Sequence, residues 1–422
     1  MHTPRPTTLP TQPPLTFDRA IADLHELNRL TSDERGAQRV AWTDTWVVAR
    51  DWLREQLSAI DGVEVETDTA GNLWASAPGD AERFVIVGSH LDSVPDGGWL
   101  DGALGVVAGL EVLRALAGGP RALGLKLVDW ADEEGARFGR SLLGSSAAAG
   151  TLHPAAVRHL RDADGVRLED ALAAHGVDLE RAGEARAQLD GAVAYLELHI
   201  EQGPVLERLD EPLGIVLGTF GVERHRIRFT GAHAHAGATP MDLRRDAFLA
   251  AARSGLAFRD AAARRSDARA TTGEVTVAPG IPTAFNGRCQ LTLDQRALDP
   301  GVLAELLADA RDASAAIAAE EGCEVAWEQI WAIEPIRFDP GLIDLAATVV
   351  TELAGSAPRL PSGPLHDASE MARVLPTAML FVRSLGGVSH TSAEDTPAAD
   401  LALAVRALDA LTRRVLSGGS EP

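Results

Sequence analysis

Three short apolar segments, each followed within two residues by an acidic residue or histidine, constrain the fold of this chain more than any other feature. The segments are 84–88, 125–130 and 193–198, and helical patterns such as 105–116 separate them. Buried strands that alternate with helices are typical of a layered α/β fold, in which ligands bind beyond the strand ends. The sequence therefore predicts a mostly parallel mixed sheet with a site at its carboxyl edge.

A second pattern interrupts the first between residues 215 and 328. Two helical segments and about four alternating segments follow one another there, which suits an inserted α+β domain with two helices on a four-stranded sheet. Further on, an apolar strand at 378–382 and a helix at 401–416 return the chain to the first domain. We expect three parts: a disordered tail at 1–16, a catalytic domain at 17–214 and 329–422, and an inserted domain at 215–328.

Charge and composition exclude several classes of partner. Asp and Glu number 61 against 39 Lys and Arg, a net charge of −22 that repels nucleic acid and anionic lipid. Nowhere does the chain reach the roughly 18 consecutive apolar residues of a membrane span, and 1–16 lacks the apolar segment of a signal peptide. Cys289 and Cys323 could form at most one disulfide, so two buried free thiols and a reducing, cytoplasmic location are expected.

The segment 88–102 carries the first candidate site residues. His90 leaves a predicted strand, and Asp92 could orient its imidazole as carboxylates orient metal-bound histidines. Asp101, reached through a glycine turn, could bridge two metal ions with its two carboxylate oxygens. Taken alone, His90 would more often be a structural histidine, and its neighbours favour a ligand instead.

Three consecutive acids, Asp132, Glu133 and Glu134, follow the next strand. They repel one another unless a cation or a proton is present, although a solvated acidic loop is the alternative. With metal bound, one carboxylate could coordinate while its neighbour serves as general base for a metal-bound water. The site is therefore expected to divide the two roles between adjacent residues.

Later strands supply further ligands. His199 follows the third apolar segment, Gln202 could donate and accept in the same cleft, and His390 follows the strand at 378–382. Three histidines and two carboxylates would complete a two-metal set.

The predicted insert carries its own candidates. His233 and His235 lie in a flexible loop of small residues, where they could form a metal or proton site or simply be solvated. Arg296 ends an apolar strand, and it could clamp a substrate carboxylate or form a surface salt bridge.

Taken together, these motifs resemble a known family. GSHLDSVPDGGWLDGALGV, DEEGARFGRSLLGS, LHIEQGPVLE, GAHAHAGATPM and GGVSH occur in the order and spacing of the two-metal aminoacylase and carboxypeptidase-type hydrolases. Within these, the chain is most similar to the hydantoinase/carbamoylase amidases: N-carbamoyl-L-amino acid hydrolases, ureidopropionases and allantoate amidohydrolases. The resemblance extends from about Leu24 to the C-terminal helix.

The resemblance implies a ligand set and a catalytic base. It places His90 and His199 on one ion, Glu134 and His390 on the other, and Asp101 between them. Glu133 is implied as general base and proton shuttle. The implied cofactors are two divalent ions per subunit, Zn²⁺ or Mn²⁺, with Co²⁺ or Ni²⁺ as further options.

The resemblance also implies a homodimer that forms through the insert. His235 would cross from a partner subunit to polarise the scissile carbonyl, and Arg296 and Asn286 would hold the substrate carboxylate. Gln202 would contact the ureido or amide end. We also expect the insert to act as a lid that closes on substrate.

Two departures leave the substrate open. Ala234 stands where Asn or Asp usually precedes the second histidine, with His233 at a position that is usually small, and Pro364-Leu365 stands where Ala-Gly is usual. Hydrolysis of a ureido amino acid is expected, with an N-acyl amino acid deacylase or dipeptidase as the alternative. Those relatives commonly carry a carboxylate where this chain has His199. A metal-free binding protein would lack a ligand or the base, and this sequence retains all of them.

Overall fold

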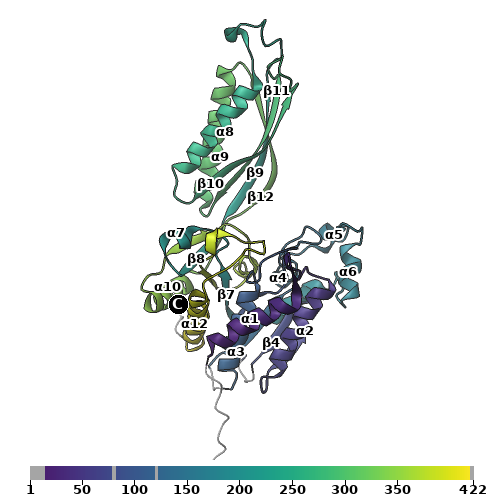
Figure 1. Ribbon diagram of the computed structural model, residues 1–422, viewed down its shortest axis with the longest axis vertical. Helices are drawn as coiled ribbons and strands as arrows, with labels where there is room; N and C mark the ends of the chain where they lie inside the picture. The colour runs from purple at the N-terminus through teal and green to yellow at the C-terminus, as the bar shows by residue number, and fades with distance from the viewer. Residues whose placement is uncertain (1–14, 78–81, 119–121, 419–422) are drawn as a thin grey trace, which may run out of the picture. The chain divides into compact units, whose positions relative to one another are not determined.

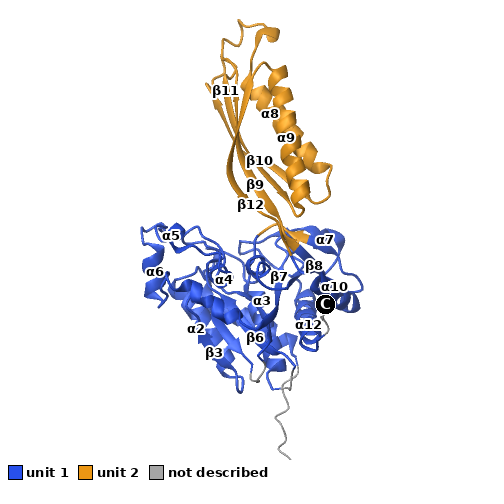
Figure 2. Ribbon diagram, turned by 180° about the vertical axis from the view of Figure 1, so that it is seen from behind, with its two compact units in different colours: residues 1–217, 338–360, 365–422 blue, residues 218–337, 361–364 orange. Residues whose placement is uncertain are grey.

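The computed structural model describes residues 15–77, 82–118 and 122–418. The chain forms two compact units, shown in Figure 2: residues 1–217, 338–360 and 365–422, and residues 218–337 and 361–364. Each unit has hydrophobic core residues of its own. The tail expected at 1–16 lies outside the described residues except for its last two positions.

A mixed sheet, nine-stranded over the described residues, is the centre of the first unit (Figure 1). Its strands are β3 (Glu64–Thr67), β4 (Leu73–Ser76), β5 (Phe84–His90), β6 (Gly124–Trp130), β7 (Ala192–Ile200), β8 (Leu213–Thr219), β13 (Ile336–Arg337), β14 (Arg359–Ser362) and β15 (Thr377–Val382). The order is β13-β8-β15-β7-β5-β6-β4-β3, and β14 pairs with β8. The neighbours β15, β7, β5 and β6 are parallel, whereas β4 and β8 pair antiparallel with them.

Helices cover the central strands, whose residues are mostly apolar. All seven residues of β5 and the last seven of β7 are buried, as expected for parallel strands covered on both faces. The longer helices are α1 (Phe17–Thr31), α2 (Asp44–Ser58), α3 (Ala103–Leu116), α10 (Pro340–Ala354) and α12 (Ala398–Leu416). Of these, α3 packs on β5, β6 and β7, and α12 packs on β7 and β15. The hydroxyl of Thr43 caps α2 and the carboxylate of Asp339 caps α10, so the sequence itself sets where both helices begin.

Shorter elements connect these layers. They are β1 (Ser32–Asp33), β2 (Gly36–Ala37), α4 (Leu143–Ala149), α5 (Pro154–Val157), α6 (Leu168–Ala174), α7 (Val205–Leu209), α11 (Asp367–Met371) and the 3-10 helices η1 (Ala182–Leu189), η2 (Met241–Leu243) and η3 (Leu385–Gly387). Of these, η2 belongs to the second unit.

The second unit is an antiparallel sheet with two helices on one face (Figure 2). Its elements are β9 (Gly221–Thr230), α8 (Ala247–Ala263), β10 (Ala268–Ala278), β11 (Arg288–Ala297), α9 (Pro300–Glu320) and β12 (Glu324–Ile333), with strand order β10-β11-β9-β12. Burial alternates along β11, where Cys289, Leu291 and Leu293 join the core while the residues between them are only half-buried. This period of two is what a sheet with one covered face requires.

The fold class predicted from the sequence is confirmed: a layered α/β domain with a mixed sheet, and an α+β unit of two helices on four strands. The four short helical segments between residues 143 and 189 were not predicted. None of the described helices is both long and apolar enough to span a membrane.

Candidate metal centre

Predicted site residues follow neighbouring strands of the central sheet. His90 is the last residue of β5, and His199 is the penultimate residue of β7. Glu134 follows β6, and His390 follows β15 through η3. Because these four strands are parallel neighbours, their carboxyl ends meet at one edge, where α/β folds bind ligands.

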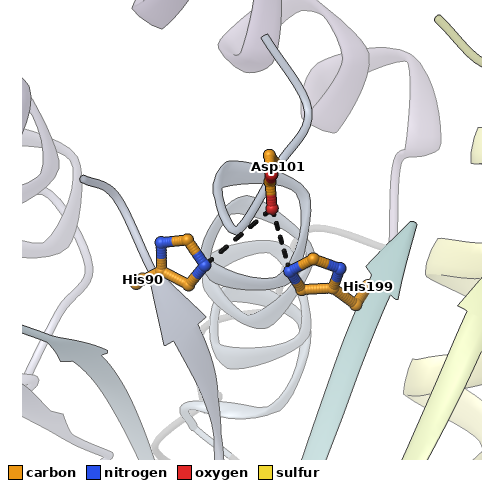
Figure 3. A group of neighbouring side chains, drawn as sticks. All are labelled: His90, Asp101 and His199. Carbon is orange, nitrogen blue, oxygen red and sulfur yellow. Dashed lines mark ion pairs between the residues drawn. The ribbon is translucent and has the colours of Figure 1, made fainter. Parts of the chain in front are cut away.

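Asp101 stands between two groups of potential metal ligands. In the first, shown in Figure 3, its Oδ1 lies 3.2 Å from Nε2 of His199 and 4.0 Å from Nε2 of His90. In the second, its Oδ2 lies 3.2 Å from Nε2 of His390, which is 3.5 Å from Oε2 of Glu134. Within each group the ligand atoms lie within 4.8 Å of one another. The structure thus brings together the five residues expected to be ligands.

Both buried imidazoles are held in the orientation that a metal ligand needs. Nδ1 of His90 lies 3.0 Å from the carbonyl oxygen of Asp92, and Nδ1 of His199 lies 2.9 Å from that of Ile200. A carbonyl oxygen can only accept, so each Nδ1 carries the proton and donates it. Each Nε2 is therefore the nitrogen that faces Asp101 and is left to bind a metal ion, the arrangement usual for metal-bound histidine.

A glycine turn fixes Asp101 against His90. Gly102 has a φ of 64° and immediately precedes α3. A Cβ atom on Gly102 would lie 2.4 Å from Cε1 of His90. The imidazole therefore packs directly on this backbone, and no other residue fits at position 102.

Asp92 holds the acidic segment as well as the imidazole. Its Oδ1 accepts the N–H of Glu133 at 3.1 Å, and its Oδ2 accepts the N–H of Glu134 at 3.1 Å. The contact of His90 is with the backbone carbonyl of Asp92, since the carboxylate lies 3.6 Å from Nδ1. Asp132 has a φ of 59°, and its side chain accepts a hydrogen bond from Trp42 Nε1 at 2.7 Å.

Burial and nearby charges shift the pKa values of the acidic residues in the site. Burial, with a contribution from Asp101, raises the pKa of Glu134 to about 7. Burial also raises the pKa of Glu133 well above its usual range, against the opposing effect of His90. Burial acts on Asp101 in the same direction, but His199 and His390 hold its pKa well below the usual range. So many carboxylates around one point favour a bound cation.

Divalent cations fit this donor set. Over the described residues, Oε1 of Glu134 is buried without a hydrogen-bond partner, and Nε2 of His199 has Oδ1 of Asp101 at 3.2 Å but no hydrogen bond of good geometry. Imidazole nitrogen and carboxylate oxygen are ligands that Zn²⁺ and its first-row neighbours accept. Each of the two groups offers three such ligands.

Gln202 and Glu133 lie beside the ligand groups. Gln202 has a φ of 56°, and its Nε2 donates to Oδ2 of Asp101 at 2.9 Å. Oε2 of Glu133 lies 3.7 Å from Nε2 of His90. Glu133 belongs to neither ligand group, so its carboxylate remains available to accept a proton.

The sequence interpretation missed His366 and Glu197. The rings of His366 and His199 lie 4.5 Å apart, and these two histidines form a third buried group with Glu197. Glu197 accepts hydrogen bonds from the hydroxyls of Ser89 and Tyr195. The signal for His366 was available, because it follows β14 just as the predicted ligands follow their strands.

Three predicted residues, His235, Asn286 and Arg296, lie in the second unit. His235 is exposed, and its Nδ1 accepts the N–H groups of Gly237 at 3.1 Å and Ala238 at 3.2 Å. Its Nε2 therefore carries the proton and can donate it to a ligand.

The second unit separates these residues along β11. Asn286 precedes β11 next to Ala284, which pairs with His235. Near the other end of β11, Arg296 donates from Nε to Oδ1 of Asp294 at 2.8 Å. At the strand rise of about 3.4 Å per residue, the ends of β11 are roughly 25–30 Å apart. One copy of the unit therefore cannot bring all three side chains to one small molecule.

The chain is similar to known proteins over most of its length. The family model described as Peptidase family M20/M25/M40 matches residues 86–414. An N-carbamoyl-L-amino acid amidohydrolase of Geobacillus stearothermophilus is 36% identical over 92% of this chain and 95% of its own length. An allantoate amidohydrolase of Bacillus subtilis is 32% identical over 89% of this chain and 92% of its own. The crystal structure of a hydantoinase/carbamoylase family amidase from Burkholderia multivorans is 33% identical, covers 97% of this chain and 99% of its own, and superposes with a TM-score of 0.85.

Proposed function

Because the chain belongs to the peptidase family M20/M25/M40, we propose that it is a metal-dependent amidohydrolase that cleaves a C–N bond of an N-carbamoyl amino acid or a related ureido acid. The observation that carries this proposal is the pair of ligand groups that share Asp101, with the free carboxylate of Glu133 beside them. Relatives named for hydrolysis of N-carbamoyl-L-amino acids and of allantoate support the substrate class.

We propose that the site holds two divalent ions, one on His90, Asp101 and His199 and one on Asp101, Glu134 and His390. Zn²⁺ or Mn²⁺ suits this mixed set, and Co²⁺ or Ni²⁺ would also be accepted. When bound, the ions supply Lewis acidity that polarises a carbonyl and lowers the pKa of water.

Glu133 moves the proton. It accepts a proton from the attacking water as the new C–O bond forms, and it delivers that proton to the leaving nitrogen as the C–N bond breaks. Burial raises the pKa of Glu133, which suits a carboxylate that must hold a proton between these two events. From an N-carbamoyl amino acid, cleavage of one C–N bond leaves a carbamic acid, which decomposes on its own, so the final products are the amino acid, carbon dioxide and ammonia.

The remaining residues bind substrate in this proposal. Gln202 contacts the ureido end, Arg296 and Asn286 hold the carboxylate, and His235 donates from Nε2 to the scissile carbonyl. Because His235 and Asn286 lie at the opposite end of β11 from Arg296, two copies of the chain must contribute to one site.

A homodimer through the second unit meets this requirement. Phe248, Leu256 and Val275 are exposed, and they line an apolar groove of about 440 Å³ between α8 and β10. β10 is also an edge strand of its sheet, and edges of this kind pair readily with a second copy. We further propose a cytoplasmic location, because the thiols of Cys289 and Cys323 are free.

A substrate panel tests the proposal. Protein loaded with Mn²⁺ or Zn²⁺ is assayed for ammonia from N-carbamoyl-L-amino acids, N-carbamoyl-β-alanine and allantoate, and for free amino acid from N-acetyl amino acids. We expect ammonia from at least one ureido compound and none in the presence of chelator. Free amino acid from the acetylated substrates alone would assign the protein to the deacylases instead.

A further inference from the structure

One buried carboxylate at the edge of the metal centre has no part in the mechanism above. Glu394 lies between η3 and α12, four residues beyond His390, and its side chain belongs to neither of the two proposed ligand groups. Only 2% of its surface is exposed. A carboxylate buried to this degree costs free energy unless its oxygens accept hydrogen bonds.

Both oxygens of Glu394 do accept hydrogen bonds, from two different loops. Oε1 accepts the backbone N–H groups of Leu100 and Asp101, each at 3.0 Å. Oε2 accepts the hydroxyl of Ser389 at 2.8 Å. The backbone carbonyl of Glu394 accepts Nε1–H of Trp99 at 3.1 Å. Segments almost 300 residues apart in the chain are thereby joined at one side chain.

The packing around Glu394 is as close as its hydrogen bonding. A Cβ atom on Gly98 would lie 2.0 Å from the carboxyl carbon of Glu394. The carboxylate therefore rests directly on the backbone of the loop that carries Asp101, and neither loop can shift without the other.

Ser389 extends the connection to Gln202, whose amide in turn donates to Oδ2 of Asp101. Its Oγ lies 3.2 Å from Oδ2 of Asp101 and 3.3 Å from Nε2 of Gln202. A hydroxyl has one hydrogen to donate, and the shortest contact is with Glu394, so Ser389 can accept from Gln202 at the same time. The chain neighbour of Ser389 is His390, whose φ of 59° is one that most residues avoid and that surrounding contacts must maintain.

We propose that Glu394 is a positioning residue, which sets the separation between the bridging carboxylate of Asp101 and the imidazole of His390. This inference rests on the proposed metal-dependent function, because it concerns the ion held by Asp101, Glu134 and His390. Without the carboxylate of Glu394, two backbone N–H groups and one hydroxyl lose their acceptor, and the two loops lose their common support.

The test compares Glu394→Ala and Glu394→Gln with a matched control, Glu111→Ala. Glu111 is also fully buried and accepts a backbone N–H and arginine side chains, but it lies in the middle of α3 and contacts Thr16 and Arg19. The readouts are Zn²⁺ affinity in competition with a chromophoric chelator, the visible spectrum of the Co²⁺-loaded protein, and thermal unfolding.

We expect Glu394→Ala to weaken binding of the ion on Asp101, Glu134 and His390 by about 10–100-fold. The Co²⁺ spectrum should change as well. Glu394→Gln retains Oε1 as acceptor for both N–H groups, so it should stay within about threefold of the wild type. Glu111→Ala should lower the unfolding temperature and leave metal affinity and spectrum unchanged. If Glu394→Ala does not fold, Glu394→Asp, which is shorter by one methylene, should show the same selective loss.

Wild-type affinity and spectrum in Glu394→Ala would overturn the inference, and so would an equal loss of affinity in Glu111→Ala. Failure of the wild type itself to bind Zn²⁺ or Co²⁺ would instead refute the proposed function. The two failures are therefore distinct.

Discussion

Glu133 and Glu134 are adjacent in the chain but differ in their surroundings. Asp92 fixes the backbone of both, yet only Glu134 faces His390 and Asp101, while Glu133 faces His90. The backbone bends at these two residues, and their carboxylates contact different histidines, so one can coordinate while the other transfers a proton.

Substitution separates these two roles. Glu133→Ala should keep the metal content of the wild type and lose about 10²–10⁴-fold in kcat, which is the usual contribution of a general base. Glu134→Ala should lose bound metal as well as activity. Metal analysis and steady-state kinetics on the same preparations provide the measurement, and equal metal content with equal residual activity would show that the assignment is wrong.

Metal affinity should rise as the pH is raised. Burial raises the pKa of Glu134 to about 7, and the contact with Asp101 raises the pKa of His390 to about 9. Both groups therefore hold protons in the metal-free protein at pH values below these, and a cation must displace them. Apparent affinity should rise between pH 6 and pH 9, by up to about tenfold per pH unit for each proton released. Competition with a chelator at three pH values measures this slope, and an affinity that falls with pH would contradict the assignment.

The sequence was enough to predict which residues form the site, but not the backbone conformation that some of them adopt. The histidines and acids of the site stand out because each follows an apolar segment that had to be a buried strand. The positive φ angles of Asp132, Gln202 and His390 carry no local signal, since none of these residues is glycine. Tertiary contacts hold those conformations, so they become visible only in the folded structure.

At the scale of elements, α8 and β10 both expose apolar side chains on the second unit. Their exposed apolar side chains line one groove, and the proposal assigns that groove to a second copy of the chain. Continuous apolar surface of this kind is a common sign of an interface.

If the proposed dimer forms through this groove, Leu256→Arg should convert it to a monomer, because the substitution places a charge in the apolar interface. Leu256 is 56% exposed, so the substitution leaves the core of the unit intact. Leu209→Arg, at a leucine on α7 that is 53% exposed, is the matched control and should remain dimeric. Sedimentation velocity reports both states. A monomeric wild type, or a dimeric Leu256→Arg, would reject this interface.

Long periodic elements were predictable, and irregular ones were not. The two helical segments expected between residues 215 and 328 are confirmed as α8 and α9. Strand β12 was not located, because a bulge between Gln329 and Trp331 breaks its alternation. The helices α4, α5 and α6 are four to seven residues long, which is too short for a helical period to appear.

At the scale of the whole molecule, the described residues form separate cores in the two units. The proposed metal ligands all belong to the first unit, so bound metal stabilises that unit directly. Ligands that bind only the native state stabilise it by about 2.7 kcal/mol at a hundredfold excess over Kd.

Removal of metal should therefore destabilise the first unit against thermal unfolding and leave the second unit unchanged. In calorimetry at low protein concentration, chelation should lower the unfolding temperature of the first unit by several degrees, while a second transition stays in place. A fragment-resolved method such as hydrogen exchange assigns each transition to its unit. Equal shifts in both units, or no shift, would contradict the placement of the metal.

The most direct test of the account is the rate of ammonia release from an N-carbamoyl-L-amino acid while Zn²⁺ or Mn²⁺ is added back to chelator-stripped protein. We expect no activity in the stripped protein, and a rate that rises with added metal to a plateau at about two equivalents per chain. Full activity in the stripped protein with chelator present would contradict the account, as would a plateau at one equivalent.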